Sequence, residues 1–203
     1  AMNNLGVLYA DEGNREKSKE LYEKAASKGD TEAMNNLGLL YYNERDKEKS
    51  KEWYEKASSK GDTEAMNNLG VLYADEGNRE KSKELYEKAA SKGYTDAMNN
   101  LGVLYDNEGD KEKAKELYEK AASTGDTDAM NNLGRFYYKE GNKEKAKEWI
   151  EKAASKGNVE AIYNLGVFYE NEGNKEKAKE WYEKSAAKGS KKAKEALEKM
   201  KKD

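Results

Sequence analysis

The sequence predicts an all-α fold: a right-handed superhelical solenoid of helix-turn-helix repeats, with six 32-residue repeats and a C-terminal capping helix. One hexapeptide, Ala-Met-Asn-Asn-Leu-Gly, recurs at a constant spacing, which is typical of a repeat architecture. Of the 203 residues, 39% are charged and 35% are hydrophobic, so stacked repeats with a thin core fit this composition better than one globular core. The 15 tyrosines and three tryptophans argue against disorder.

The repeat frame sets the expected boundaries. The hexapeptide starts at Ala1, Ala33, Ala65, Ala97 and Ala129, and it returns as Ala-Ile-Tyr-Asn-Leu-Gly at Ala161. Residues 1–190 therefore hold six repeats, and residues 191–203 form the closing helix. The repeats, numbered one to six, are 1–32, 33–64, 65–96, 97–128, 129–160 and 161–192, so the sixth overlaps the start of the closing helix.

The first half of each repeat has the pattern of an amphipathic helix. In repeat one the apolar positions form a stripe at helical spacing: Met2, Leu5, Leu8 and Tyr9. Gly6 and its equivalents lie in the same helix, where the lack of a side chain allows a neighbouring helix to approach closely. A bulky residue at Gly102 is therefore expected to overpack the stack, at a cost of ~1–3 kcal/mol.

A short turn around Gly13 and Asn14 separates the two helices of repeat one. Glycine adopts the positive-φ conformation of such a turn at little cost, and Asn14 can cap the second helix through its side-chain oxygen. The equivalents of Asn14 are all good cap residues: Asp46, Asn78, Asp110, Asn142 and Asn174. Arg45 takes the place of the turn glycine in repeat two, so we expect some backbone strain there.

The second helix of repeat one is predicted from about Arg15 to Lys28. Its inner face consists of Ser18, Leu21, Tyr22, Ala25 and Ala26. On its outer face Glu20 and Lys24 form an i,i+4 pair in the favourable order. Gly29 is expected to end the helix in the left-handed conformation, with one of the next two residues capping the following helix.

The two ends of the chain differ. Residues 191–203 keep Ala193, Leu197 and Met200 on an inner face and carry mostly lysine or glutamate elsewhere, which is typical of a polar capping helix. No matching cap precedes repeat one. Either preceding repeats have been removed, or the end that carries Met2 and Leu5 associates with another molecule, including a second copy of the chain.

The composition excludes several kinds of site. The chain has no cysteine and no histidine, so it lacks the usual ligands of metal sites and the side chain that titrates near neutral pH. We expect no metal, no other cofactor and no catalytic activity. The net charge of −3 makes nucleic acid an unexpected partner, and no apolar run reaches the ~18 residues that a membrane span needs. The abundance of lysine, asparagine, glutamate and tyrosine fits an AT-rich bacterial genome.

The repeat resembles the tetratricopeptide repeat and the related Sel1-like repeat. The tetratricopeptide pattern is carried by Leu5, Gly6, Tyr9, Ser18, Tyr22 and Ala25, although the family's usual period is longer, about 34 residues. The stretch Tyr-Glu-Lys-Ala-Ala-Ser-Lys-Gly-Asp-Thr-Glu-Ala-Met-Asn-Asn-Leu-Gly is similar to the Sel1-like signature. The resemblance covers essentially the whole chain. It implies the predicted fold and a scaffold or adaptor role, with a protein or peptide bound in a concave groove that the first helices line.

The resemblance also places candidate ligand-binding residues in that groove. The second asparagine of the hexapeptide forms a column that can hold a peptide backbone or, alternatively, satisfy helix-end groups of a neighbouring repeat. Its proposed ligand-binding members are Asn36, Asn68, Asn100 and Asn132. Arg135, Tyr138 and Lys139 share one helix face and could receive an acidic side chain or a C-terminal carboxylate, unless they are neutral variation on a solvated face. Tyr42 and Tyr163 are added as aromatic anchors.

Two other functions stay open from the sequence. An engineered consensus scaffold without a natural ligand fits the nearly identical repeats, whereas scattered exceptions such as Tyr94 and Ile150 fit a natural history better. An RNA-binding helical repeat is the weaker alternative, because Asp11, Asp75 and Asp106 are expected in the groove and would repel phosphates.

Overall fold

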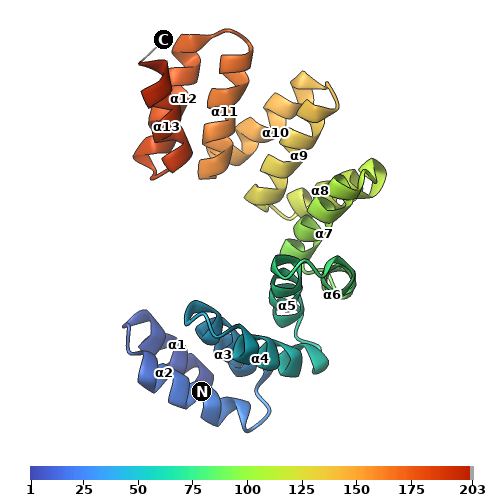
Figure 1. Ribbon diagram of the computed structural model, residues 1–203, viewed down its shortest axis with the longest axis vertical. Coiled ribbons are helices and arrows are strands. Elements are labelled where there is room, and N and C mark those ends of the chain that lie inside the picture. The colour runs from blue at the N-terminus through green and yellow to red at the C-terminus, as the bar shows by residue number, and fades with distance from the viewer. Residues whose placement is uncertain (202–203) are drawn as a thin grey trace. The chain divides into compact units, whose positions relative to one another are not determined.

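The computed structural model describes residues 1–201, and over that range the chain is all-helical, with thirteen α-helices and no strand (Figure 1). The first helices of the six repeats are α1 (Met2–Asp11), α3 (Thr31–Asn43), α5 (Thr63–Asp75), α7 (Thr95–Glu108), α9 (Thr127–Lys139) and α11 (Val159–Asn171). The second helices are α2 (Arg15–Ala26), α4 (Lys47–Ser59), α6 (Arg79–Ser91), α8 (Lys111–Ser123), α10 (Lys143–Ser155) and α12 (Lys175–Ala187). The closing helix is α13 (Lys191–Met200), and residues 202–203 of the predicted closing segment lie outside the described residues.

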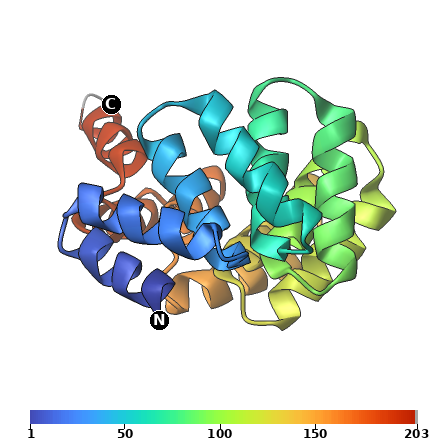
Figure 2. The same ribbon diagram turned by 90° about the horizontal axis from the view of Figure 1, so that it is seen from below.

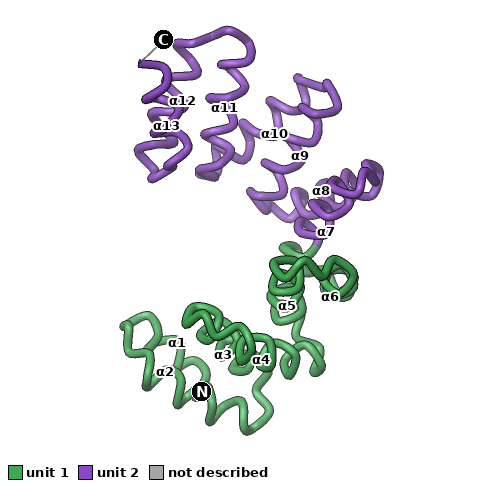
Figure 3. The backbone as a smooth tube through the Cα atoms, in the orientation of Figure 1, with its two compact units in different colours: residues 1–97 green, residues 98–203 purple. Residues whose placement is uncertain are grey.

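The chain divides into two compact units, Ala1–Ala97 and Met98–Asp203, which are unit 1 and unit 2 in Figure 3. In unit 1 the helix pairs α1/α2, α3/α4 and α5/α6 form hairpins, and the second helix of one hairpin packs on the first helix of the next (Figure 2). Unit 2 follows the same rule in α9/α10 and α11/α12, and α13 packs on α12. The prediction of packed helical hairpins is confirmed; the right-handed sense of a superhelix stays a prediction.

The turns and caps form as the sequence predicts. The Asn14 side chain accepts a hydrogen bond from the backbone N–H of Lys17, and Asp30 does the same for Ala33. Gly29 ends its hairpin with φ of 89°. Arg45 has φ of 63°, so a side chain occupies the left-handed conformation that glycine holds in the equivalent turns, which confirms the expected strain.

The core of each hairpin depends on a glycine that faces a large side chain. A Cβ atom on Gly6 would lie 2.6 Å from Cε1 of Tyr22, and one on Gly102 would lie 2.8 Å from Cε1 of Tyr118. These separations are shorter than any normal carbon contact, so the first helix can approach the second only without a side chain at this position. The glycine is therefore a packing requirement.

Stacking, rather than the single hairpin, buries the apolar stripe. In α1, which carries no preceding hairpin, Met2, Leu5 and Leu8 are 37%, 43% and 52% exposed. In α3, which α2 covers, Met34 is 6% exposed and Leu37 is fully buried. At the other end α13 buries Ala193 and half-buries Leu197 and Met200, as predicted for a capping helix. No described helix is both long enough and apolar enough to cross a lipid bilayer.

Candidate functional site

The predicted residues Arg135, Tyr138 and Lys139 come together at one pocket of unit 2. It has a volume of about 170 Å³ and lies between the first helices α9 and α11, with α10 behind it. We call it the α9/α11 pocket; its lining consists of Arg135, Tyr138, Lys139, Ile150, Asn164, Val167, Phe168 and Asn171. The repeat frame brings these residues together because α9 and α11 are first helices of consecutive repeats.

The Tyr138 ring forms part of the wall of this pocket. The ring packs edge-on against Phe168, with centroids 5.9 Å apart at 66°. The amide nitrogen of Asn171 donates a hydrogen bond to the Tyr138 hydroxyl over 3.0 Å. Tyr138 is thus half-buried and fixed at both its apolar and its polar end.

The two cations of the cluster differ in what they can still bind. The Lys139 ammonium lies 2.7 Å from a carboxylate oxygen of Asp106, one repeat earlier. Arg135 is exposed, and within residues 1–201 its side chain makes no ion pair or hydrogen bond. Burial raises the pKa of the neighbouring Tyr118 above its usual range, the Asp106 charge adds to this shift, and the Arg135 charge opposes it. Arg135 is therefore the cation available to an acidic ligand.

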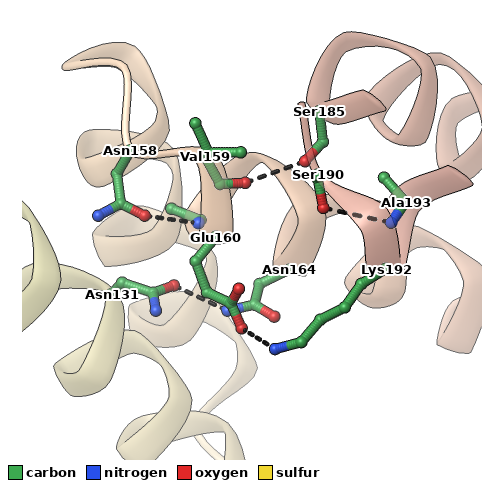
Figure 4. Close-up of polar contacts among 10 residues, drawn as sticks. Asn131, Asn158, Val159, Glu160, Asn164, Ser185, Ser190, Lys192 and Ala193 are labelled. Carbon is green, nitrogen blue, oxygen red and sulfur yellow. Dashed lines mark hydrogen bonds and ion pairs between the residues drawn. The ribbon is translucent and has the colours of Figure 1, made fainter. Parts of the chain in front are cut away.

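The asparagine column makes contacts between repeats. The Asn36 amide nitrogen donates to Oδ1 of Asn3 over 2.9 Å, and Asn68 donates to Asn35 over 3.1 Å. The same bond joins Asn132 to Asn99 over 3.0 Å and Asn164 to Asn131 over 2.8 Å; Figure 4 shows the last of these. Asn100 is half-buried in α7. In these four pairs, one donor of the second asparagine is used inside the protein.

Sequence reasoning missed the acceptor of this bond. The first asparagine of the hexapeptide is the buried partner: Asn3 is 2% exposed, Asn35 is 1% exposed and Asn131 is 4% exposed. The signal was present, because a polar residue recurs at a fixed position beside the apolar stripe of the first helix. A buried amide in this place needs a partner, and the next repeat supplies it.

Polar contacts also join consecutive repeats at the start of the first helices (Figure 4). The Asn158 side chain caps α11 through the N–H of Ala161 and donates to Asp128 over 2.6 Å. The Lys192 ammonium lies 2.8 Å from Glu160. These contacts join α9, α11 and α13 of unit 2 through residues that do not line the α9/α11 pocket.

Tyr163, which the sequence analysis added as an aromatic anchor for a ligand, lies outside the α9/α11 pocket. Its ring packs against Tyr182, with centroids 5.5 Å apart. The Tyr182 hydroxyl donates to Glu170, and burial, together with this carboxylate, raises the pKa of Tyr182. Tyr163 therefore belongs to the packing of α11 on α12 and α13.

A second pocket in unit 1 has the equivalent position between α1 and α3, with a volume of about 480 Å³. We call it the α1/α3 pocket; it is lined by Ala10, Arg15, Ser18, Tyr22, Asn36, Leu39, Leu40, Asn43 and Glu44. Six of these residues correspond, four repeats earlier, to lining residues of the α9/α11 pocket. Ala10 corresponds to Tyr138, so the larger volume arises where the chain has a methyl group in place of a phenol ring.

Tyr42 is the equivalent of Tyr138 in repeat two and is 39% exposed on α3. Leu72, the equivalent of Phe168, is 2% exposed. Within residues 1–201, no group of three or more carboxylate, imidazole or thiol side chains is placed to hold a metal ion. The two pockets and Tyr42 are thus the features of the first-helix face that can serve a ligand.

Comparison with known protein families identifies the repeat. The family model of the tetratricopeptide repeat matches residues 1–27, 63–91, 95–124, 127–155 and 159–187. The model of the Sel1 repeat matches residues 31–62, which is almost the whole of repeat two. No curated protein sequence matches the chain.

Solved structures with the same fold include two of related sequence. A Sel1 repeat protein from Oxalobacter formigenes is 28% identical, with a TM-score of 0.76 over 92% of this chain and 86% of the other. A protective antigen of uropathogenic Escherichia coli is 29% identical, with a TM-score of 0.70 over 97% of this chain; this chain spans 47% of that antigen. PilF of Pseudomonas aeruginosa shares the fold at 19% identity, with a TM-score of 0.76 over 98% of this chain and 96% of PilF.

Proposed function

Because the chain belongs to the tetratricopeptide repeat family, we propose that it is a non-catalytic adaptor that binds a segment of another protein on its first-helix face. Proteins built from tetratricopeptide or Sel1 repeats generally act as scaffolds without enzymatic activity, and they typically bind proteins or peptides. The finer assignment is a binding site at the α9/α11 pocket for a segment that carries a carboxylate beside an apolar side chain.

One observation supports this site above others: the exposed Arg135 guanidinium has no partner in the described part of the chain, although it borders an apolar pocket. A guanidinium can bind a carboxylate through two parallel hydrogen bonds. Ile150, Val167 and Phe168 provide apolar surface directly beside it. A charge next to an apolar wall favours a ligand that presents both kinds of group.

The asparagines fit the same ligand. The Asn164 amide nitrogen donates to Asn131, so the carbonyl oxygen of Asn164, which lines the pocket, can serve as an acceptor. A backbone N–H of an extended segment can donate to such an oxygen whatever its side chain. We propose contacts with a bound segment also at Asn36, Asn68, Asn100 and Asn132, each within its own unit, with Tyr42 and Tyr138 as aromatic contacts.

The test selects binding peptides from a random library displayed on phage, with the full chain as bait, and measures their affinity by fluorescence polarisation. We expect acidic peptides to be enriched. Arg135→Gln should weaken them about tenfold, because a hydrogen bond to a charged group contributes roughly 1.5–3 kcal/mol. Lys139→Gln is the matched control and should have a smaller effect, since Lys139 already pairs with Asp106.

If the parent and Arg135→Gln bound the acidic peptides with equal affinity, the proposed carboxylate site would be wrong. A broader variant with alanine at Tyr42, Arg135, Tyr138 and Tyr163 tests the face as a whole. If this variant bound the selected peptides as tightly as the parent, binding on the first helices would be wrong.

A further inference from the structure

We propose that the α1/α3 pocket receives a tyrosine side chain of the bound protein segment, in the place that Tyr138 fills in the α9/α11 pocket. This inference rests on the proposed function, because it requires a protein segment along the first helices. It concerns unit 1 by itself and specifies the side chain that this unit binds.

The chain contains its own example of the occupied state. Tyr138 reaches from α9 across to α11, packs edge-on against Phe168 and accepts a hydrogen bond from Asn171. The α1/α3 pocket has the same arrangement with Leu40 at the position of Phe168 and Asn43 at the position of Asn171. Leu39 stands for Val167 and Asn36 for Asn164. Ala10 replaces Tyr138, so the α1/α3 pocket has no ring at that position, and Tyr22 stands where unit 2 has Ile150.

The exposure of the apolar lining shows that no side chain among the described residues covers the α1/α3 pocket in place of this ring. Phe168 is 7% exposed behind Tyr138, and Leu72 is 2% exposed where repeat two carries Tyr42. In the α1/α3 pocket Leu40 is only half-buried, and Leu39 is 43% exposed. An apolar wall of this kind gains from being covered by an aromatic ring of a ligand.

Polar groups of the pocket match a phenol rather than a plain aromatic ring. The Asn43 side chain is exposed and has no partner among the described residues, so its amide can donate to a hydroxyl as Asn171 does to Tyr138. Ser18 also lines the pocket; it is fully buried and its hydroxyl has no hydrogen-bond partner. In repeat two the equivalent Ser50 donates to the carbonyl of Gly38 over 2.8 Å. The equivalent Ser82 of repeat three is also buried without a partner, so this feature recurs in the repeat, and Asn43 is the group of the pocket that distinguishes a phenol from a plain ring.

The rim charges indicate what flanks the tyrosine. In unit 2 Lys143 and Glu172, which lie outside the lining of the α9/α11 pocket, form an ion pair of 2.6 Å. The equivalents Arg15 and Glu44 line the α1/α3 pocket, and among the described residues they form no ion pair with each other. Arg15 is therefore available to an acidic residue next to the tyrosine. The occupant is a protein segment with a tyrosine beside an acidic residue.

The experiment titrates N-acetyl-tyrosinamide into the full chain and measures binding by saturation-transfer NMR. N-acetyl-phenylalaninamide should bind about fivefold more weakly, because it lacks the hydroxyl that Asn43 can bond, and N-acetyl-leucinamide weaker still. Asn43→Leu should remove the preference for tyrosine over phenylalanine. Equal binding of the three probes to the parent chain would overturn the proposal.

Two reciprocal variants locate the site. Ala10→Tyr places a ring in the α1/α3 pocket and should weaken the probe at least about tenfold. Tyr138→Ala empties the α9/α11 pocket and should add a second binding site for the same probe. Circular dichroism melting shows that both variants are folded. Unchanged binding to Ala10→Tyr would overturn the assignment.

Sedimentation of the parent chain distinguishes a second copy from another protein. If the parent self-associates and Ala10→Tyr is monomeric, the occupant is a second copy and the proposed partner is wrong. A parent that does not self-associate supports the proposal. The two proposals can fail separately. The effect of Arg135→Gln on acidic peptides tests the proposed function and does not depend on Ala10, whereas the effect of Ala10→Tyr on the tyrosine probe tests this inference.

Discussion

The α1/α3 pocket of unit 1 and the α9/α11 pocket of unit 2 occupy the same position in the repeat, yet Ala10 lines the larger one and Tyr138 the smaller one. Their volumes are about 480 Å³ and about 170 Å³. Most of their lining is equivalent, and the Tyr138 ring stands at the place of Ala10. The repeat therefore decides where a pocket forms, and a single side chain decides whether it is available.

The floors and rims of the two pockets differ as well. Tyr22 forms the floor of the α1/α3 pocket and Ile150 that of the α9/α11 pocket. In unit 2 Lys143 pairs with Glu172, whereas among the described residues their equivalents Arg15 and Glu44, which line the α1/α3 pocket, do not pair with each other. Similar sequences thus give one pocket suited to a whole side chain and one suited to a charge at its edge.

The largest expected effect comes from alkaline pH, and it should not distinguish the two units. Burial raises the pKa of three tyrosines in each unit: Tyr54, Tyr86, Tyr94, Tyr118, Tyr137 and Tyr182. The pKa of Tyr137 rises to about 12, from an ordinary value of 10.0. A raised folded-state pKa contributes stability that is complete below the unfolded-state pKa and is lost as pH rises through the folded-state pKa. The free energy of unfolding should therefore fall above pH ~10 in both units.

Tryptophan fluorescence during urea denaturation separates the units. Trp53 lies in unit 1, and Trp149 and Trp181 lie in unit 2. Trp53→Phe leaves fluorescence from unit 2 alone, and the double variant Trp149→Phe/Trp181→Phe leaves that of unit 1. If one unit lost stability at a pH where the other did not, the similarity of their cores would be broken.

The next largest effect on stability is expected from replacing the glycine that packs against the second-helix residue of each pocket, Tyr22 or Ile150. A Cβ on Gly134 would lie 2.5 Å from Cγ1 of Ile150 and 3.0 Å from the backbone oxygen of Ala146. A Cβ on Gly6 would meet chiefly the ring of Tyr22, at 2.6 Å. We expect Gly134→Val to cost about 3 kcal/mol and Gly6→Val about 1 kcal/mol, because a ring beside an open pocket can move and a backbone cannot. Urea denaturation measures the free energy of unfolding of both variants. Equal losses would mean that the Tyr22 ring cannot move into the α1/α3 pocket.

The smallest effect is expected at the rims. Lys143→Gln removes an ion pair whose side chains are 54% and 41% exposed, so solvent screens most of the attraction. The Glu172 carboxylate raises the pKa of Lys143, which shows the direction of the interaction. We expect a slight fall in Tm that disappears at high salt, and no change for the matched variant Arg15→Gln. A larger fall for Arg15→Gln would show that the α1/α3 rim is closed in solution.

Much of the local structure could be predicted from the sequence. The cap at Asn14, the left-handed Gly29 and the strained Arg45 depend on nearest neighbours, so their residue types predict them. The grouping of Arg135, Tyr138 and Lys139 follows from helical spacing on one face. The position of Tyr163 could not be predicted from helical spacing, because its contact with Tyr182 depends on packing between α11 and α12.

By itself the sequence determined the hairpins, their period and the burial of an apolar stripe by a neighbouring repeat, because these depend on spacing along the chain. Only the tertiary structure decided that Asn36 is bonded to Asn3, that Lys139 is paired with Asp106 and that Arg135 is not paired. Such contacts join residues about one repeat apart, and their distances depend on how two hairpins stack. For the same reason only the structure distinguishes the larger pocket beside Ala10 from the smaller one beside Tyr138.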